Sequence, residues 1–460
     1  MSKSNFNRQF ILGITLVSAM GGLLFGYDWV VIGGAKPFYE RFFNITQSPY
    51  LQGWAMSSAL IGCLVGALVS GYLSDRFGRK KPLIAAAALF TVAAIGTGAV
   101  NNFTLFIVFR LIGGLGIGLA SAISPMYIAE ISPASMRGRL VSVNQLTIVL
   151  GILAAQITNY LIAEAVPTGA TDDFILNSWN GQSGWRCMFW AGTVPALLFF
   201  VLSFFIPESP RFLAKTGKSE DAFSILKRIG GEAYALQEQK EITETLHGTD
   251  SKIDWKALGS KKVRPVLILG IVLAVFQQWC GINVIFNYAD EIFTSAGYSV
   301  GDMLFNIVIT GTVNLIFTVA AMRVVDSWGR RKLMLLGSSG LAVIYLALGA
   351  SYFFELKGLA ILVLVMVAIA TYAMTLAPIT WVVLSEIFPN SVRGAAMAIA
   401  TTALWIACFV LTYTFPILNK LLNASGTFWL YAFICLSGFL FILKKLPETK
   451  GKSLEEIEKM

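Results

Sequence analysis

Two short stretches, Asp75-Arg-Phe-Gly-Arg-Lys-Lys81 and Asp326-Ser-Trp-Gly-Arg-Arg-Lys332, decide the fold of this chain. Each combines an acidic residue, an aromatic residue, a glycine and a group of cations, and the two lie about 250 residues apart. Glu130 and Glu386, at a similar separation, each precede an Arg-Gly step by seven residues. Repetition at one fixed distance indicates an internal duplication, so the sequence predicts two similar halves.

Apolar residues fill the sequence around these stretches in blocks of about twenty, the length that crosses the hydrocarbon core of a bilayer. Of the 460 residues, 56% are hydrophobic and only 13% are charged, whereas soluble proteins carry about 25% charged residues. The blocks do not alternate between polar and apolar positions, which excludes a porin-type barrel. The predicted fold class is therefore an all-α membrane protein.

Twelve transmembrane helices are predicted, six in each of two pseudo-symmetric halves. Their approximate ranges are 9–32, 50–73, 82–101, 104–126, 140–163, 186–206, 265–289, 303–325, 332–354, 359–384, 395–418 and 427–443. The chain divides into an N-terminal half (1–206), a linker (207–264), a C-terminal half (265–443) and a tail (444–460). Charged residues at helical spacing from Ser219 to Leu246 predict short amphipathic helices in the linker. Two parallel halves are typical of transporters that alternate access to a site between them.

The cations fix the orientation of these helices. With the N-terminus inside, the tails, the linker and the loops on the same side hold 29 of the 35 Lys and Arg residues, as expected of cytoplasmic segments. Only Lys36, Arg41, Lys357 and Lys420 fall in loops of the opposite side, with Arg186 at an edge. We predict a multi-pass protein of the cell (inner) membrane with both termini cytoplasmic. The net charge of +9 then follows from topology and requires no nucleic acid partner.

Asp28 and Arg110 are the only charged residues well inside the predicted spans. At a rise of 1.5 Å per residue they lie about 6 Å and about 9 Å below the same membrane edge, so the two side chains can meet. Charges at such depth tend to be functional. In one interpretation the pair is a protonation switch, because a carboxylate that loses its cationic partner in a dry site binds a proton more tightly. In the other it is a static ion pair that holds two helices together.

Charged residues at the cytoplasmic ends of both halves form a second candidate site. Four residues of the first half match four of the second: Asp75, Arg79, Glu130 and Arg137 against Asp326, Arg330, Glu386 and Arg393. We expect an inner gate of salt bridges that breaks when the protein opens inward; the alternative is that these charges only determine topology. Because orientation requires positive charge alone, the repeated acidic residues favour the gate.

Polar uncharged side chains gather in the predicted span 265–289. They are Gln277, Gln278, Asn283, Asn287 and Tyr288, on both sides of Gly281. A carbohydrate needs amide donors and acceptors and an aromatic face, whereas a single buried amide more often joins helices. Five such residues in twelve positions favour the lining of a cavity. Further polar residues in two other spans extend this set: Asn306, Thr310, Asn314 and Thr318, and Asn144, Gln145, Gln156 and Asn159.

The remaining motifs predict packing and not chemistry. Gly113-Gly-Leu-Gly-Ile-Gly118 lies inside an apolar span, where closely spaced glycines indicate helix packing and not a dinucleotide site. The five cysteines also lie in apolar segments. The spans hold no histidine, no nucleophile–base pair and no metal cluster, so we predict no enzyme activity, no metal and no cofactor.

Taken together, several strings resemble the sugar porter family of the major facilitator superfamily, over nearly the whole chain. They are Gly21-Gly-Leu-Leu-Phe-Gly-Tyr-Asp28, Asp75-Arg-Phe-Gly-Arg79, Pro125-Met-Tyr-Ile-Ala-Glu130, Pro207-Glu-Ser-Pro-Arg211, Gln277-Gln-Trp-Cys-Gly-Ile-Asn283, Ser385-Glu-Ile-Phe-Pro389 and Pro447-Glu-Thr-Lys-Gly451. Within the family, the chain resembles the bacterial xylose–proton symporters and the animal facilitative glucose transporters.

The resemblance implies a role for each matching residue. Sugar contacts are expected from Phe25, Gln145, Gln277, Gln278, Asn283, Asn314 and Trp381, and proton coupling from Asp28 and Arg110. Facilitative relatives carry Asn where Asp28 stands. The chain departs from the pattern at Leu404, in place of an amide that contacts sugar, at Asn287, in place of a gating tyrosine, and at Ala377, in place of a glycine.

The function predicted from the sequence is proton-coupled uptake of a monosaccharide, a pentose or a hexose, by alternating access. The alternatives are a facilitative uniporter, in which Asp28 and Arg110 form a static pair, and a non-transporting sugar sensor. Sensors of the family have long cytoplasmic tails, whereas about seventeen residues follow the last predicted span. The expected partners are the sugar, protons and the lipid bilayer, and the expected functional unit is a monomer.

Overall fold

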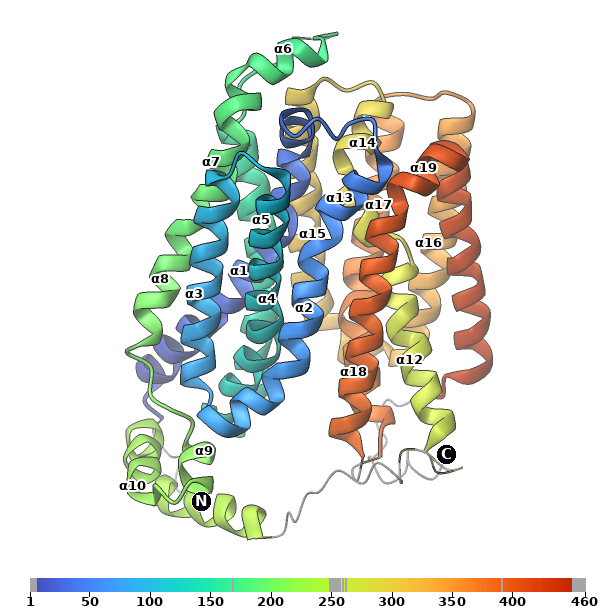
Figure 1. Cartoon of the computed structure of the whole chain (residues 1–460). Coiled ribbons are helices and arrows are strands. Elements are labelled where there is room, and N and C mark those ends of the chain that lie inside the picture. The colour runs from blue at the N-terminus through green and yellow to red at the C-terminus, as the bar shows by residue number, and fades with distance from the viewer. Residues whose placement is uncertain are drawn as a thin grey trace.

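A computed structural model describes residues 6–167, 169–247, 258, 260, 263–389 and 392–448. All regular structure within these residues is helical, and eleven of the described helices are long and apolar enough to cross a membrane. The last of them, α19 (Arg393–Lys445), contains two arms, because the backbone leaves the helical conformation at Asn423 (φ 58°, ψ 176°). Figure 1 shows the chain reversing there. The structure thus confirms the all-α fold with two sets of six crossings.

The first half is built from helices α1 to α8. Their bounds are α1 (Arg8–Phe42), α2 (Pro49–Phe77), α3 (Lys80–Ala99), α4 (Phe103–Ile131), α5 (Arg137–Ile162), α6 (Asp172–Asn177), the π-helical turn η1 (Asn180–Gly184), α7 (Trp185–Ala191) and α8 (Thr193–Ser203). The helices η1, α7 and α8 follow one another directly and form the sixth crossing. In the described part of the linker, α9 (Pro210–Lys215) and α10 (Ser219–His247) follow, and α10 contains two arms because the backbone leaves the helical conformation at Gly231 (φ 83°, ψ 179°).

The second half continues to α19 and contains two broken crossings. Its other helices are α12 (Arg264–Trp279), α13 (Ile282–Asn287), α14 (Ala289–Ser295), α15 (Val300–Trp328), α16 (Arg330–Phe353), α17 (Leu359–Met374) and α18 (Leu376–Ile387). The break between α12 and α13 lies at Gly281, whose φ of 87° suits glycine because it has no Cβ. The break between α17 and α18 lies at Thr375.

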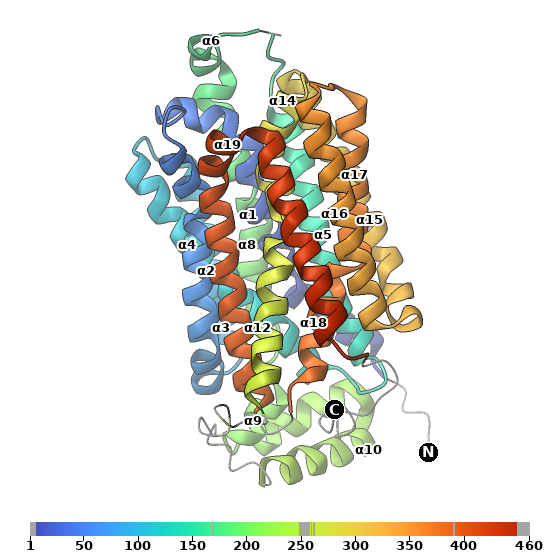
Figure 2. The ribbon, with the colours of Figure 1, turned by 90° about the vertical axis from the view of Figure 1, so that its right-hand side faces the viewer.

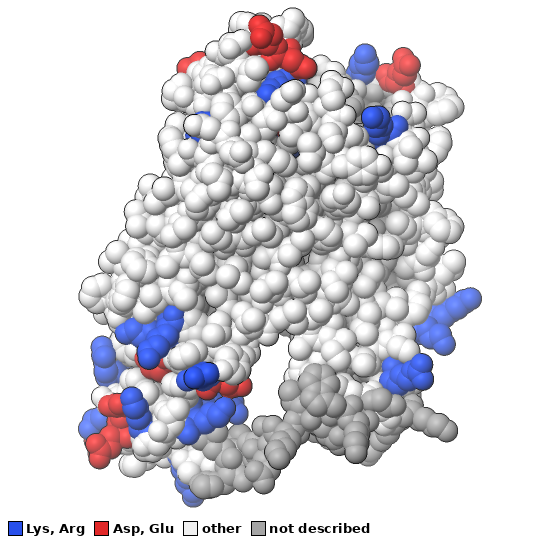
Figure 3. Space-filling model, viewed as in Figure 1, with Lys and Arg blue, Asp and Glu red and all other residues white. Residues whose placement is uncertain are grey.

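The two ends of the bundle differ in charge. Helices α9 and α10 lie at the bottom in Figures 1 and 2, and the ring of Phe6 packs on Tyr234 of α10. Lys and Arg side chains gather at this end in Figure 3. We call it the basic end, and we call the end that carries α6 and α14 the opposite end.

The helices separate at the basic end and pack together at the opposite end. Figure 3 shows a hollow at the basic end, between the helices of the first half and those of the second. Near the opposite end, Trp54 of α2 packs on Phe409 of α19, and Tyr160 of α5 packs on Phe305 of α15. The molecule is therefore open toward its basic end.

Helix α1 continues to Phe42, well beyond the predicted end at residue 32. Lys36 and Arg41, which we expected in a loop of the opposite side, belong to this helix. Lys36 is also buried, at 2% exposed. The prediction that Lys36 lies in a loop was therefore wrong. Hydropathy counts a lysine as unfavourable, but the helix can carry one where carboxylates neutralise it, as they do here.

Gly114 and Gly118 let α4 pack directly against α2, in agreement with the close helix packing predicted for Gly113–Gly118. A Cβ on Gly114 would lie 1.9 Å from the carbonyl oxygen of Ala59, and a Cβ on Gly118 would lie 2.2 Å from that of Cys63. Such distances leave no room for any side chain, so the backbones of the two helices are in contact.

We predict that Gly114→Ala lowers the melting temperature of the detergent-solubilised protein, since an extra carbon in a tightly packed contact costs about 1–3 kcal/mol. Gly71→Ala in α2 is the matched control, because its Cβ would meet nothing within 4 Å. That control should hold or raise the melting temperature, because Ala favours a helix over Gly by about 1 kcal/mol. Equal shifts for the two variants would contradict the packing argument.

Candidate functional site

The structure brings Asp28 of α1 and Arg110 of α4 into direct contact. Nη1 of Arg110 lies 2.9 Å from Oδ1 and 3.0 Å from Oδ2 of Asp28. The Arg110 side chain is 3% exposed and that of Asp28 is 17% exposed. Gly113 follows one turn later on α4, and a Cβ there would lie 3.5 Å from Oδ2 of Asp28. The predicted meeting of the two charges therefore occurs, in a place that solvent barely reaches.

The surroundings of this ion pair are largely apolar. The guanidinium of Arg110 lies 5.9 Å from the ring centre of Phe189, and a small pocket beside Asp28 is lined by Phe90 and Phe189. A second small pocket, beside Arg110, is lined by Trp29 and Asn287, among others. In such a medium an unpaired charge is costly, so the two residues depend on each other.

The three amides of the predicted sugar site form one hydrogen-bonded chain. Nε2 of Gln278 donates to Oε1 of Gln277 at 2.6 Å, and Nδ2 of Asn283 donates to Oε1 of Gln278. Gln277 in turn donates to the hydroxyl of Tyr372 in α17, at 2.9 Å. The break at Gly281 makes this chain possible, because residues five apart on a straight helix would not share a face.

The other predicted sugar contacts lie on different helices. Gln145 on α5 and Trp381 on α18 are exposed, whereas Asn314 on α15 is buried. Phe25 on α1 packs against Trp405 on α19, with ring centres 6.1 Å apart. This contact joins the two halves. In the described part of the chain, neither Gln145 nor Trp381 has a hydrogen bond to the amide chain.

Two of the positions that depart from the family pattern face the interior. Leu404 is 4% exposed and Asn287 is 5% exposed. Oδ1 of Asn287 accepts no hydrogen bond, and the backbone oxygen of Asn287 lies 3.1 Å from where a Cβ on Gly33 would stand. An unpaired amide oxygen therefore lies where α1 of the first half crosses α13 of the second.

The charges at the basic end pair within each half. Nη2 of Arg79 lies 2.7 Å from Glu130, and Nη2 of Arg330 lies 3.2 Å from Glu386.

The remaining residues of the predicted gate make local contacts. Arg137 and Arg393 donate to backbone oxygens of their own half, and Asp75 pairs with Lys215. The side chain of Asp326 lies outside the described residues. The Arg79–Glu130 and Arg330–Glu386 pairs thus occupy corresponding places in the two halves.

Sequence reasoning missed two acidic residues that complete this duplication. Glu208 accepts backbone N–H groups of Arg79 and Lys80, at 2.8 and 3.3 Å. Glu448 accepts those of Arg330 and Arg331, at 2.9 and 3.2 Å. Each carboxylate binds free N–H groups at a helix start, where the helix dipole favours negative charge. The repeated Pro-Glu steps at 207 and 447 were the signal for them.

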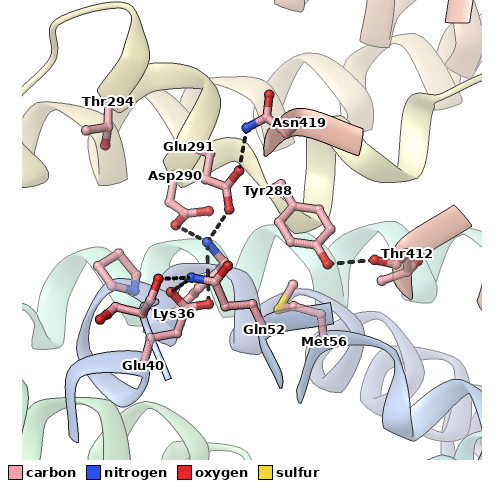
Figure 4. A network of polar contacts seen from close by, with 12 residues as sticks. Lys36, Glu40, Gln52, Met56, Tyr288, Asp290, Glu291, Thr294, Thr412 and Asn419 are labelled. Carbon is pink, nitrogen blue, oxygen red and sulfur yellow. Dashed lines mark hydrogen bonds and ion pairs between the residues drawn. The ribbon is translucent and has the colours of Figure 1, made fainter. Parts of the chain in front are cut away.

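Sequence reasoning also missed Lys36, which Figure 4 shows among carboxylates at the opposite end. Its Nζ lies 2.6 Å from Glu291 and 3.1 Å from Asp290, both on α14, and 3.6 Å from Glu40. A Lys–Glu pair four residues apart after a long apolar block was the available signal. These contacts join the first half to the second.

A family model described as sugar (and other) transporter matches residues 14–460. This chain belongs to the sugar transporter family. The D-xylose–proton symporter of Escherichia coli is 39% identical, over 99% of this chain and 96% of that protein. The arabinose–proton symporter of Bacillus subtilis is 41% identical, over 98% and 95%.

The fold of this sugar transporter is also found among solved structures. The inward-open conformation of the xylose transporter from Escherichia coli aligns with a TM-score of 0.85 at 38% identity, over 98% of this chain and 99% of that one. The chain therefore has the major facilitator fold of a multi-pass membrane transporter, and its family comprises transporters and not enzymes.

We predict that Glu208→Gln lowers the melting temperature of the detergent-solubilised transporter, because a neutral amide loses the charge-assisted bonds to the helix start. Caps and helix-end charges contribute about 0.5–2 kcal/mol. Glu164→Gln is the control, since Glu164 is an exposed residue outside the helices. If both variants melt alike, the capping role of Glu208 is wrong.

Proposed function

We propose that this transporter imports a monosaccharide together with protons, by alternating access between the halves 1–206 and 265–443. The observation that carries the proposal is the buried contact of Asp28 with Arg110, at 2.9 Å. A buried carboxylate keeps its charge while its cationic partner stays close, and binds a proton when that partner moves away. Motion of α4 relative to α1 would thereby load or release a proton.

The cargo would bind at the amide chain of α12 and α13. Gln277, Gln278 and Asn283 would give their donors and acceptors to sugar hydroxyls, together with Gln145, Asn314, Trp381 and Phe25. The similar symporters named above are described as carriers of D-xylose and arabinose, which supports a pentose. Because Leu404 and Asn287 differ from the family pattern near this site, we propose a pentose or a hexose as the class of cargo.

The basic end would face the cytoplasm, because Lys and Arg gather there and cytoplasmic segments of membrane proteins collect positive charge. The transporter would then lie in the cell (inner) membrane with both termini cytoplasmic, and the structure would be open inward. A monomer would suffice for function, since both halves of the site come from one chain.

The charged residues of the basic end would act as the inner gate. Arg79 with Glu130, and Arg330 with Glu386, hold within each half the charges that would meet across the halves when the transporter faces outward. Asp75, Arg137, Asp326 and Arg393 would complete the two sets. The hollow between the halves is consistent with an open gate.

Asp28→Asn tests the proton carrier. In proteoliposomes with an inward proton gradient, we expect sugar accumulation to fall to the equilibrium level, because Asn cannot take up the proton. Exchange of labelled sugar across the membrane should continue, since exchange needs no net proton movement. The control is Asp221→Asn, on the exposed face of α10, which should accumulate sugar like the parent chain.

Accumulation by Asp28→Asn would refute the carrier assignment and favour the facilitative uniporter. Absence of transport by the purified parent chain, with every sugar of a panel of pentoses, hexoses and inositols, would favour the sugar sensor.

Gln278→Ala tests the sugar site. We expect the KM of exchange to rise about tenfold, since removing one partner of a buried hydrogen-bonded set costs about 1–3 kcal/mol. Gln237→Ala, an exposed residue of α10, is the control and should leave KM unchanged. If KM stays the same in Gln278→Ala, the sugar does not bind to the amide chain.

A further inference from the structure

Four charged side chains form a buried cluster at the opposite end, and Figure 4 shows them converging. Lys36 and Glu40 come from α1, and Asp290 and Glu291 come from α14. The side chains of Lys36, Glu40 and Asp290 are 3%, 7% and 8% exposed, and that of Glu291 is 23% exposed. We call these four residues the outer cluster. It lies far along α1 from Asp28, and the proposed proton pathway does not use it.

The sequence brings the cluster together in two steps. Lys36 and Glu40 are four residues apart and therefore share one face of α1, while Asp290 and Glu291 occupy the first turn of α14, where the helix dipole favours acidic residues. Gly33 then lets the backbone of α1 approach that of Asn287 closely. The cluster forms only where the two halves touch, so it exists only while the opposite end is closed.

The charges of the cluster do not balance. One ammonium group faces three carboxyl groups, which leaves a net charge of minus two if all are ionised. Oε1 of Glu40 and Oδ1 of Asp290 are buried and accept no hydrogen bond. Several carboxylates that share one dry site cannot all remain ionised, because each charge disfavours the next. The site is therefore built to hold an added proton.

The other groups that face the cluster do not supply a second cation. From α2, Gln52 donates to Glu40 at 3.2 Å, and from α19, Asn419 donates to Glu291 at 3.0 Å. Two tyrosines also face the cluster. They are Tyr39 on α1 and Tyr288, whose ring centre lies 5.5 Å from Nζ of Lys36.

The nearest arginines are engaged elsewhere. Arg41 pairs with Asp172, and Arg110 pairs with Asp28. The described residues include no group that could hold a metal ion in place of a proton. Burial raises the pKa of the Asp290 carboxyl to about 6, against the opposing effect of Lys36.

We propose that the outer cluster is a second proton-binding site, which takes up one proton as the opposite end closes and returns it to the same side as that end opens. On opening, water reaches the carboxyl groups and they ionise. On closing, burial favours the protonated form. The cluster therefore makes closure of the opposite end favourable at low pH on that side, without adding to the protons carried across the membrane.

This inference rests on the proposed alternating access but not on Asp28 as the proton carrier. It is therefore tested in the full-length chain that carries Asp28→Asn, so that titration of Asp28 cannot contribute. Spin labels at Gln47→Cys and Leu421→Cys, both exposed residues near the opposite end, report the distance between the halves. The same chain without these two cysteines controls for labelling of the native ones.

The ratio of closed to open molecules should rise about tenfold between pH 7 and pH 5. The sign follows from linkage: a carboxyl that titrates near 6 when closed and near 4 when open binds its proton more tightly in the closed state. Glu40→Gln and Asp290→Asn should each reduce this change at least threefold and keep the end closed at pH 7. Asp302→Asn, an exposed acid at the same end, should change nothing.

Lys36→Met provides an independent readout, because it removes the only cation of the cluster. We expect the opposite end of this variant to open at pH 7 and to close again at pH 5, where the carboxyl groups are protonated. A pH dependence that survives unchanged in both Glu40→Gln and Asp290→Asn would overturn the proposal. So would a Lys36→Met variant that stays closed at pH 7, or a parent chain whose distances do not change with pH.

Discussion

A charge in the apolar interior of a membrane protein must be paired, and helix α1 carries one partner of each of two such pairs. Asp28 joins α1 to α4 within the first half through Arg110. Lys36 joins α1 to α14 of the second half through Asp290 and Glu291. Removing one partner of a buried pair costs about 3–5 kcal/mol, since the other is left unpaired. Helix α1 can therefore move relative to its neighbours only where a partner charge finds water, a proton or a new counter-ion.

The two ends of the molecule differ in whether their ion pairs cross between the halves. At the opposite end, Lys36 binds carboxylates of the second half. At the basic end, Arg79 binds Glu130 and Arg330 binds Glu386, each within its own half. Among the described residues, ion pairs cross between the halves at the opposite end, where the helices pack together. The basic end, where Figure 3 shows a hollow, has its described pairs within each half. In the proposed function, access to the site would therefore be linked to which ion pairs form at each end.

The sequence predicted those features that depend on hydropathy and on repetition. The apolar blocks gave the crossings, the repeated motifs gave the two halves, and the depth of Asp28 and Arg110 predicted their contact. It did not predict that α1 carries Lys36 beyond residue 32. Two partners of Lys36, Asp290 and Glu291, lie about 250 residues away in the sequence, and hydropathy does not detect such pairing.

Other features could not be predicted from the sequence for a different reason. The roles of Glu208 and Glu448 depend on carboxylates folding back onto distant helix starts. The open end could not be predicted either. The same residues must support an alternative conformation, so no local pattern selects one of the two.

The amide chain of Gln277, Gln278 and Asn283 shows how a group of polar side chains can persist among apolar helices. Each amide forms a hydrogen bond with the next, and the hydroxyl of Tyr372 accepts a hydrogen bond at one end of the chain. In the proposed function, a sugar that binds here would replace these bonds with bonds of its own, so only the difference between the two sets of bonds would stabilise the complex. Net hydrogen-bond contributions are about 1 kcal/mol each. The proposed site would thereby suit a ligand that must bind, cross and leave, because tight binding in either conformation would trap the cargo.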